Sequence, residues 1–350
     1  MTAQSKLKIG VLGASGYTGA DLVRLLATHP NAEIRVLTAN QHAGKPMREV
    51  YPHLGALDLP DLVKWEDADW SGLDVAFCGL PHGTTQEIVA AMPDGLKVVD
   101  LSADFRLRDP EVYAEWYGHP HQALQLQEEA VYGLTELNRP AVQAARLVAC
   151  PGCYPTAALL ALVPVVGAGL VESEDVVIDA KSGVTGAGRK VTQQLLFAEV
   201  GEGIHPYGVA KHRHAPEMEQ EIGLAAGGRP VRVSFTPHLM PMNRGELVTC
   251  YLRLAGGATA DDLRATLAER YADEPFVRVL PAGESPATRN VRGSNYAVVG
   301  VFEDRIPGRA IVICAIDNLV KGSSGQAIQN MNLMTGLAET TGLEQQPLFP

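Results

Sequence analysis

The chain has few cysteines, no long apolar run and no excess of basic residues, and each of these absences argues against one class of protein. Its five cysteines are an odd number scattered over 350 residues, which is not a disulfide framework and favours a reducing, cytoplasmic setting. No apolar run reaches the roughly 18 to 20 residues of a membrane-spanning helix, and the N-terminal residues lack the apolar region of a signal peptide. The net charge of -11 argues against a nucleic-acid partner, because phosphate binding needs a basic face. We therefore expect a cytoplasmic globular protein that acts on a small molecule, with no nucleic-acid or membrane partner.

The spacing of apolar segments predicts two domains. Over the first 150 residues, short apolar runs alternate with helical patterns, which is typical of a Rossmann-type doubly wound parallel sheet of the α/β class. Longer β-rich segments follow and predict an α+β domain with a mixed sheet: Asp175–Ala180, Val231–Pro237, Leu247–Leu254, Ala297–Glu303 and Ala310–Ile316. We place the nucleotide-binding domain at 1–152 and a catalytic and oligomerisation domain at 153–320. A final helix within 321–350 is expected to return to the first domain.

A glycine-rich turn follows the first predicted strand. Gly13, Gly16 and Gly19 are a variant of the dinucleotide-binding fingerprint, in which glycines let a helix N-terminus approach a pyrophosphate. The pattern stands between a strand and a helix, so we interpret it as a nucleotide site rather than a plain turn.

The end of the second predicted strand bears on the choice of nucleotide. An NAD-selective site usually places an acid there, on the ribose 2′-hydroxyl, but residues 37–42 contain no carboxylate. The missing acid removes repulsion against a 2′-phosphate, which Thr38, Asn40 and Lys45 would bind. We therefore favour NADP over NAD; the alternative is that Thr38 and Asn40 are simply loop residues. A second glycine loop at 181–189 would either fold over the cofactor or form a flexible turn.

Cys153 lies on a predicted turn at the mouth of a buried helix. Pro151 and Gly152 make the turn, and Pro155 suits the first helical position. Free backbone N–H groups and the positive helix end favour a thiolate and would hold an oxyanion. This arrangement indicates a dehydrogenase that works through a thioester. Cys150 and Cys153 also form a C-x-x-C pair, so a redox-active disulfide is an alternative.

The segment around His212, Arg213 and His214 supplies candidate acid–base groups. Glu217 would orient His214 as the acid of a triad does, and Arg213 would bind a phosphate or carboxylate with two hydrogen bonds. A solvated basic loop is one alternative. A zinc site is another, since His-x-His plus Glu can ligate zinc, but cysteine chemistry needs no metal and we expect none.

Two further segments follow predicted strands at the ligand-facing end of the first sheet. Arg106 and Arg108 are candidate anion clamps, although Asp104 and Arg106 would also pair with each other. Residues 80–83 would contact the cofactor or form a plain turn.

Together these motifs resemble the type 1 N-acetyl-gamma-glutamyl-phosphate reductases of the aspartate-semialdehyde dehydrogenase-like superfamily. The resemblance covers nearly the whole chain, through GASGYTG, LPHG, DLSADFRL, PGCYPTAALLAL, HRHxPE, PMxRG and DNLVKGSSGQAIQNMN in that order. It implies that Cys153 is the nucleophile and that the His212–His214 segment supplies the acid–base group, with His214 preferred and His212 second. One departure is Cys150, where the family often has Asn.

The resemblance also implies a reaction. An acyl phosphate, N-acetyl-gamma-glutamyl phosphate, would be reduced with NADP(H) to N-acetyl-glutamate 5-semialdehyde in arginine biosynthesis. One rival is the related reductase of carrier-linked aminoadipyl phosphate in lysine biosynthesis, whose cysteine motif tends to be GxGCN rather than PGCY. A rival of another class is an NADP-binding redox sensor that uses Cys150 and Cys153 without turnover.

The same resemblance implies the remaining contacts and the assembly. The expected substrate contacts are Arg106, Arg213 and Tyr207. The expected cofactor contacts are Gly13, Ser15, Gly16, Tyr17, Thr18, Gly19, Thr38, Pro81, Ser182, Gly183, Gly186, Gly188 and Asn318. A homodimer or homotetramer is expected to form through the second domain.

Overall fold

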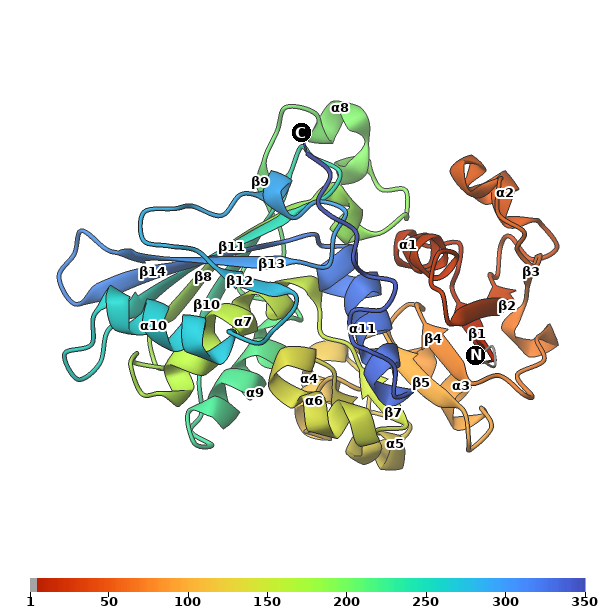
Figure 1. Cartoon of the computed structure of the whole chain (residues 1–350), viewed down its shortest axis with the longest axis horizontal. Coiled ribbons are helices and arrows are strands. Elements are labelled where there is room, and N and C mark those ends of the chain that lie inside the picture. The colour runs from red at the N-terminus through yellow and green to blue at the C-terminus, as the bar shows by residue number, and fades with distance from the viewer. Residues whose placement is uncertain (1–4, 350) are drawn as a thin grey trace. The chain divides into compact units, whose positions relative to one another are not determined.

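The computed structural model describes residues 5–349 and divides into two compact units (Figure 1). The first unit extends to Pro151 and includes Ser323–Glu344; the second comprises Gly152–Gly322 and the residues from Gln345. Each unit has its own seven-stranded sheet. No helix in the described part of the chain is long and apolar enough to cross a membrane.

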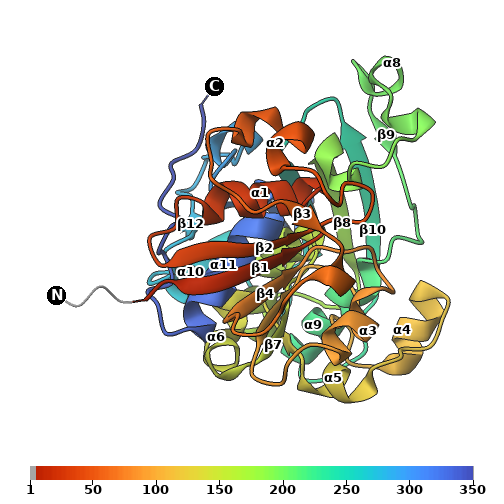
Figure 2. The same ribbon diagram turned by 90° about the vertical axis from the view of Figure 1, so that its right-hand side faces the viewer.

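The sheet of the first unit is parallel and has the strand order β3-β2-β1-β4-β5-β7-β6. Figure 2 shows β2, β1 and β4 running side by side. The sequences of the central strands are mostly apolar because both faces of the sheet are covered. The predicted doubly wound sheet is confirmed. Its strands are β1 (Leu7–Leu12), β2 (Ala32–Thr38), β3 (Leu62–Val63), β4 (Val75–Cys78), β5 (Lys97–Asp100), β6 (Val131–Tyr132) and β7 (Leu147–Ala149).

The helices of this unit include one from the far end of the chain. They are α1 (Tyr17–Leu26), α2 (Met47–Val50), α3 (Thr85–Ala90), α4 (Pro110–Tyr117), α5 (Leu124–Glu129), α6 (Thr135–Ala144) and α11 (Gly325–Met334), with short 3-10 turns at Pro52–Leu54 and Trp65–Asp67. Helix α11 is buried along its whole length and packs against α1, α6 and β5. Polar side chains anchor it: Asn332 Oδ1 lies 3.0 Å from His29 Nε2, and Asn330 Nδ2 donates to Gly133 O at 2.8 Å.

The sheet of the second unit is mixed, with the order β12-β13-β14-β11-β8-β10-β9. Its pairings are parallel between β8 and β10 and between β12 and β13, and antiparallel elsewhere, so the predicted mixed sheet is confirmed. Its strands are β8 (Val176–Gly183), β9 (His205–Pro206), β10 (Val233–Met240), β11 (Glu246–Arg253), β12 (Val277–Val279), β13 (Ala297–Glu303) and β14 (Arg309–Ile316). Strand β8 extends beyond the predicted end at Ala180 because Ser182 still pairs with both neighbouring strands.

Helices cover one face of this second sheet (Figure 1). They are α7 (Cys153–Gly167), α9 (Ala215–Ala225) and α10 (Ala260–Arg270). The short elements are α8 (Phe197–Val200) and the 3-10 turns Val184–Ala187, Gln193–Leu195 and Thr288–Asn290, and a π-helical segment, Val320–Ser324, directly precedes α11. Helix α7 packs on β11 and β14 and between α9 and α10. It is apolar nearly all round, as a helix covered on several sides must be. Its buried position fixes the place of its first residue, Cys153.

Candidate active site

Cys153 is the first residue of α7 and is partly exposed. Gly152 is the N-cap, and no side chain in the described chain caps the helix. The helix therefore begins two residues before Pro155, contrary to the prediction, because Gly152 O already accepts the Thr156 N–H at 2.9 Å. The thiol thus stands in the first helical turn, where unpaired N–H groups and the helix dipole favour an anion.

Two side chains from the start of α9 contact the turn before Cys153. A Cβ on Gly152 would lie 2.4 Å from His214 Nε2, so the imidazole packs where only glycine leaves room. Glu217 is 1% exposed, and its Oε1 accepts the Gly152 N–H at 2.8 Å. The structure therefore brings together three of the predicted catalytic residues. The bond described for Glu217 holds the turn, and its predicted role in orienting His214 stays a prediction.

His212 is packed among aromatic rings. Its ring centroid lies 5.3 Å from those of both Tyr207 and Phe235, and 4.7 Å from that of His214. Its Nδ1 accepts the His214 N–H at 3.2 Å. Burial, helped by Arg213, lowers the pKa of His212 to about 4. A neutral, hydrogen-bonded His212 suits a structural role, and this leaves His214 as the better acid–base candidate.

Tyr207 belongs to the same cluster. Its hydroxyl donates to the Tyr154 hydroxyl at 3.0 Å. Burial raises the pKa of both tyrosines, and the charge of Cys153 adds to the rise for each. Both phenols therefore stay neutral, and the Tyr154 hydroxyl in turn donates to His238 O at 3.5 Å. Arg213 is exposed; the substrate contacts predicted for Tyr207 and Arg213 stay predictions.

One residue of the cluster was missed by sequence reasoning. Glu246 is the first residue of β11, is fully buried and interacts with Cys153. Its only signal in the sequence is a carboxylate at the head of an apolar strand, ELVTCYL.

Cys150 and Cys153 are both free thiols. Cys150 is fully buried, and Asn330 Nδ2 donates to its Sγ at 3.5 Å. Where the resembled family often has Asn, this chain therefore has a small buried side chain with an amide partner. This environment suits a packing role for Cys150.

The second glycine loop is held by close contacts. A Cβ on Gly183 would lie 2.7 Å from Asn243 O, and one on Gly186 would lie 3.0 Å from Ser182 Oγ. Gly188 has a φ of +79°, which favours glycine. The predicted loop is shorter than expected, because Ser182 and Gly183 are the last residues of β8.

Asn318 ties this loop to the PMxRG motif. Its Oδ1 accepts the Gly245 N–H at 2.9 Å, and its Nδ2 donates to Thr185 Oγ1 at 3.0 Å. Asn318 thus shapes the loop; direct cofactor contacts by Asn318, Ser182, Gly183, Gly186 and Gly188 stay predictions.

The glycine turn of the first unit is as closely packed. Gly13 has a φ of +73°, and a Cβ on it would lie 2.3 Å from Gly79 O. A Cβ on Gly19 would lie 2.4 Å from Gly13 O. Gly16 is the N-cap of α1, and no described side chain caps that helix. The turn fits a pyrophosphate, since its backbone is close-packed and the helix N-terminus is uncapped. The other expected contacts, Ser15, Tyr17 and Thr18, belong to this turn and the first turn of α1.

Thr38 supports this turn. It is the last residue of β2 and is 2% exposed, so the alternative that it is a loop residue is wrong. Its Oγ1 accepts the Gly13 N–H at 3.4 Å, and its carbonyl accepts the Ala14 N–H at 2.9 Å. A contact from Thr38 to a 2′-phosphate stays a prediction. Asn40 and Lys45 are exposed just beyond it.

Arg106 is fixed beside the end of β7. It is 6% exposed; its Nε donates to Cys150 O at 2.7 Å, and its Nη2 donates to Leu101 O at 3.0 Å. The guanidinium thus holds backbone carbonyls at two strand ends, and its predicted role as an anion clamp stays a prediction.

Asp104 organises the segment that contains Pro81. Its carboxylate accepts the Gly83 N–H at 2.7 Å and the Thr85 N–H at 2.9 Å. Pro81 O accepts the Thr84 hydroxyl at 2.6 Å. The segment is therefore an ordered turn into α3, and Pro81 stays a predicted cofactor contact.

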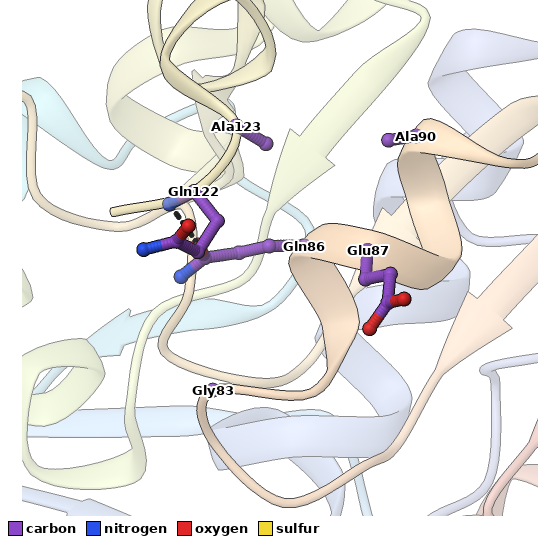
Figure 3. A pocket seen from close by; sticks show the side chains of 6 residues that line it. All are labelled: Gly83, Gln86, Glu87, Ala90, Gln122 and Ala123. Atoms are coloured by element: carbon purple, nitrogen blue, oxygen red, sulfur yellow. Dashed lines mark hydrogen bonds between the residues drawn. The ribbon is translucent and has the colours of Figure 1, made fainter. Parts of the chain in front are cut away.

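A separate cleft of about 360 Å³ lies beside α3 (Figure 3). It is lined by Gly83, Gln86, Glu87, Ala90, Gln122 and Ala123, and the Gln122 N–H donates to Gln86 Oε1 at 2.6 Å. Of the predicted segment 80–83, Gly83 lines this cleft, whereas Pro81 is not among its lining residues.

Comparisons with known proteins agree with this architecture. Residues 8–145 match the model of the semialdehyde dehydrogenase NAD binding domain, and residues 153–318 match that of the semialdehyde dehydrogenase dimerisation domain. The chain is 60% identical to an N-acetyl-gamma-glutamyl-phosphate reductase of Rhodospirillum rubrum, over 99% of both chains. It is 57% identical to a probable chloroplastic N-acetyl-gamma-glutamyl-phosphate reductase of Arabidopsis thaliana, over 99% of this chain and 86% of that one.

Solved structures show the same fold. An aspartate semialdehyde dehydrogenase II of Vibrio cholerae superposes with a TM-score of 0.72 at 17% identity, over 95% of this chain and 99% of that one. The aspartate semialdehyde dehydrogenase of Candida albicans with NADP superposes with a TM-score of 0.65 at 19% identity, over the same shares.

Proposed function

This chain belongs to the N-acetyl-gamma-glutamyl-phosphate reductase family, and we propose that it catalyses the NADPH-dependent reductive dephosphorylation of N-acetyl-gamma-glutamyl phosphate. The product is N-acetyl-glutamate 5-semialdehyde, in arginine biosynthesis. The observation that carries the reaction class is the cysteine turn, in which His214 and Glu217 both contact the Gly152 that presents Cys153 at a helix N-terminus. The choice of substrate rests on the likeness to the named reductases over the whole chain.

The proposed chemistry has two stages. The Cys153 thiolate attacks the acyl carbonyl and expels phosphate, which leaves a thioester. The N–H groups at the start of α7 stabilise the oxyanion. After reduction, the thiohemiacetal collapses to the aldehyde as His214 takes the proton from the thiohemiacetal hydroxyl. Covalent catalysis replaces one difficult step by two easier ones.

The first unit fits the cofactor. The turn at Gly13, Gly16 and Gly19 offers a close-packed backbone and an uncapped helix N-terminus to a pyrophosphate, and Asn40 and Lys45 would hold the 2′-phosphate. When bound, NADPH supplies the hydride that reduces the thioester carbon. On this proposal residues 1–152, with the helix of 321–350, bind NADP(H), and residues 153–320 carry catalysis.

The second unit also suits self-assembly, as a homodimer or homotetramer. On the sheet face opposite to α7, Tyr251 pairs with Val177 and Ile311 on the neighbouring strands. Tyr251 and Val177 are each 37% exposed. An apolar strip of this kind is typical of an interface between subunits. The cytoplasm is the proposed compartment, since all five cysteines are free thiols.

The test is NADPH formation in the oxidative direction, with phosphate and either N-acetyl-glutamate semialdehyde or aspartate semialdehyde. The proposal expects turnover with the acetylated substrate only, dependent on phosphate and absent in Cys153→Ala. Turnover with aspartate semialdehyde alone would contradict the substrate. Absence of turnover with both would favour the carrier-linked substrate of lysine biosynthesis. Equal effects of Cys150→Ala and Cys153→Ala on an NADP-linked redox response would favour the sensor.

A further inference from the structure

Glu246 is a buried carboxylate that the chemistry above does not use. It is the first residue of β11, paired with Ser182 of β8 on one side and Ile316 of β14 on the other. Its exposure is 0%, and neither carboxylate oxygen makes a regular hydrogen bond within the described residues. Burying a carboxylate without donors is costly, and such a group usually becomes neutral or gains a partner. A purely structural role would be filled at lower cost by an apolar side chain.

The position of Glu246 in the sheet directs it toward the start of α7. Val248 and Cys250 follow it at every second position of β11 and therefore lie on the same face of the strand. Both are fully buried, on the face that α7 covers. The Cys153 thiol interacts with the carboxylate directly. The backbone around Cys153 is crowded as well: a Cβ on Gly322 would lie 2.7 Å from the Cys153 Cβ. The thiol and the carboxylate therefore lie together where α7 begins against the head of β11.

Other titratable groups surround this pair. They include Tyr154 from α7, Tyr207 after β9, Cys314 from β14 and Asp317 after it. Two cations belong to the same surroundings: Arg244 Nη1 lies 3.6 Å from Asp317 Oδ1, and the buried Lys321 lowers the pKa of Cys314, which burial raises. Asp317 is held by the N–H groups of Gly293, Leu319 and Val320. Burial is the largest influence on Glu246 and raises its pKa, as Asp317 does to a smaller extent, while the Cys153 thiol lowers it, with a result of about 8. An ordinary carboxyl is too weak a base to take a proton readily from a thiol, and the raised pKa of Glu246 removes most of this difference.

We propose that Glu246 is the proton partner of Cys153: the carboxylate takes the thiol proton as the thiolate forms and returns it when the thiolate is expelled. The S–H bond breaks as the O–H bond of Glu246 forms, so the pair keeps a charge of −1 and needs no other reactant. The neutral acid then donates a hydrogen bond to the sulfur. His214 is left to serve the substrate oxygen. This proposal rests on the proposed function of Cys153 as nucleophile.

The test is the rate of Cys153 alkylation by iodoacetamide from pH 5.5 to 10.5, followed by mass spectrometry in the whole chain. The other four cysteines are buried, so the reaction is selective. Two interacting acids lose their protons in two steps. The wild type is therefore expected to show two rises in rate. Glu246→Gln keeps the shape but cannot take a proton; it is expected to show one rise, at least about one pH unit below the second wild-type rise, because the like charge is gone.

Turnover supplies an independent reading. A positioned general base contributes about 10²- to 10⁴-fold, and we expect kcat/KM to fall at least about tenfold in Glu246→Gln. Glu246→Asp should keep two rises in alkylation rate, with the second at lower pH. The matched control is Glu221→Gln, a buried carboxylate of α9 bonded to Gln220 Nε2 at 2.8 Å, which should match the wild type in both assays.

The outcomes separate this proposal from the proposed function. A folded Glu246→Gln with the wild-type alkylation profile would overturn the proton partnership even if the enzyme turns over acyl phosphate. If Glu246→Gln fails to fold, Glu246→Asp decides. A second rise in its alkylation rate at the wild-type pH would contradict the proton partnership. Failure of turnover with every substrate would refute the proposed function, while the alkylation profile, which needs no substrate, would still report on the pair.

Discussion

The starts of α1 and α7 are built alike and differ in what packs behind them. Each follows a strand and a tight turn, each has a glycine at its N-cap, and neither is capped by a described side chain. Behind the α1 turn lies backbone: a Cβ on Gly13 would meet Gly79 O at 2.3 Å. Behind the α7 turn lie side chains that can move protons, His214 against Gly152 and Glu217 on its N–H. On the proposed function, the same uncapped helix N-terminus serves cofactor binding in one unit and covalent chemistry in the other.

Removing the thiol should give the largest effect. Cys153→Ala is expected to lower kcat by about 10⁴-fold or more, because the covalent route is lost. Cys150→Ala should stay within about threefold of the wild type, since Cys150 is a buried packing residue. Initial rates of NADPH formation, with thermal midpoints as a folding control, measure both. Equal losses would point to the redox pair instead.

The two histidines should differ next. His214→Asn is expected to cost about 10²- to 10⁴-fold in kcat, as loss of a general acid–base does. His212→Asn should cost less than about tenfold, because a histidine with a pKa of about 4 is neutral at neutral pH and has no imidazolium proton to give. The pH–rate profiles check the assignment: His214→Asn should remove an inflection that His212→Asn leaves in place. Its disappearance in His212→Asn would reverse the roles.

A methyl group placed in each turn should separate binding from chemistry. Gly19→Ala would place a Cβ 2.4 Å from Gly13 O and is expected to weaken NADP(H) binding at least about tenfold, with alkylation of Cys153 unchanged. Gly152→Ala should do the reverse, because its Cβ would lie 2.4 Å from His214 Nε2 and force a shift in the turn that carries Cys153. Fluorescence titration of NADPH and alkylation rates give the two readings. If both variants lost both properties, the distinction between the turns would fail.

Sequence reasoning located both turns because each depends on residues close together in the chain. The glycine spacing and the P-G-C motif each indicate a tight turn from neighbouring residues alone, and apolar periodicity identified most strands of both sheets. Long-range contacts were out of its reach. Nothing near Glu246 in the sequence indicates that β11 starts opposite Cys153, and nothing near Thr38 indicates that its hydroxyl is taken by Gly13. The helix start was misplaced at Pro155 because the bond from Thr156 to Gly152 depends on the folded turn.

The smallest expected effect concerns stability, and it compares two buried carboxylates. Burial raises the pKa of Asp100 to about 7, although the N–H and hydroxyl of Ser102 both donate to it. The folded state therefore keeps a proton that the unfolded chain loses near pH 4. Stability should fall as pH rises from about 4 to about 7 and then level off. Asp100→Asn should flatten this decline in stability. Glu246, whose pKa is raised to about 8, causes a second decline that extends to about pH 8, and Glu246→Gln should flatten it. Urea unfolding at several pH values measures the slopes; an unchanged slope in Asp100→Asn would refute the shift.

The most direct test of the central claim is a phosphate burst without reductant. Wild-type protein mixed with N-acetyl-gamma-glutamyl phosphate, with no NADPH present, should release about one phosphate per chain and gain one N-acetylglutamyl group on Cys153, seen by mass spectrometry as a thioester cleaved by hydroxylamine. Cys153→Ala should show neither. Phosphate release that needs NADPH, or an acyl group on another residue, would contradict the account.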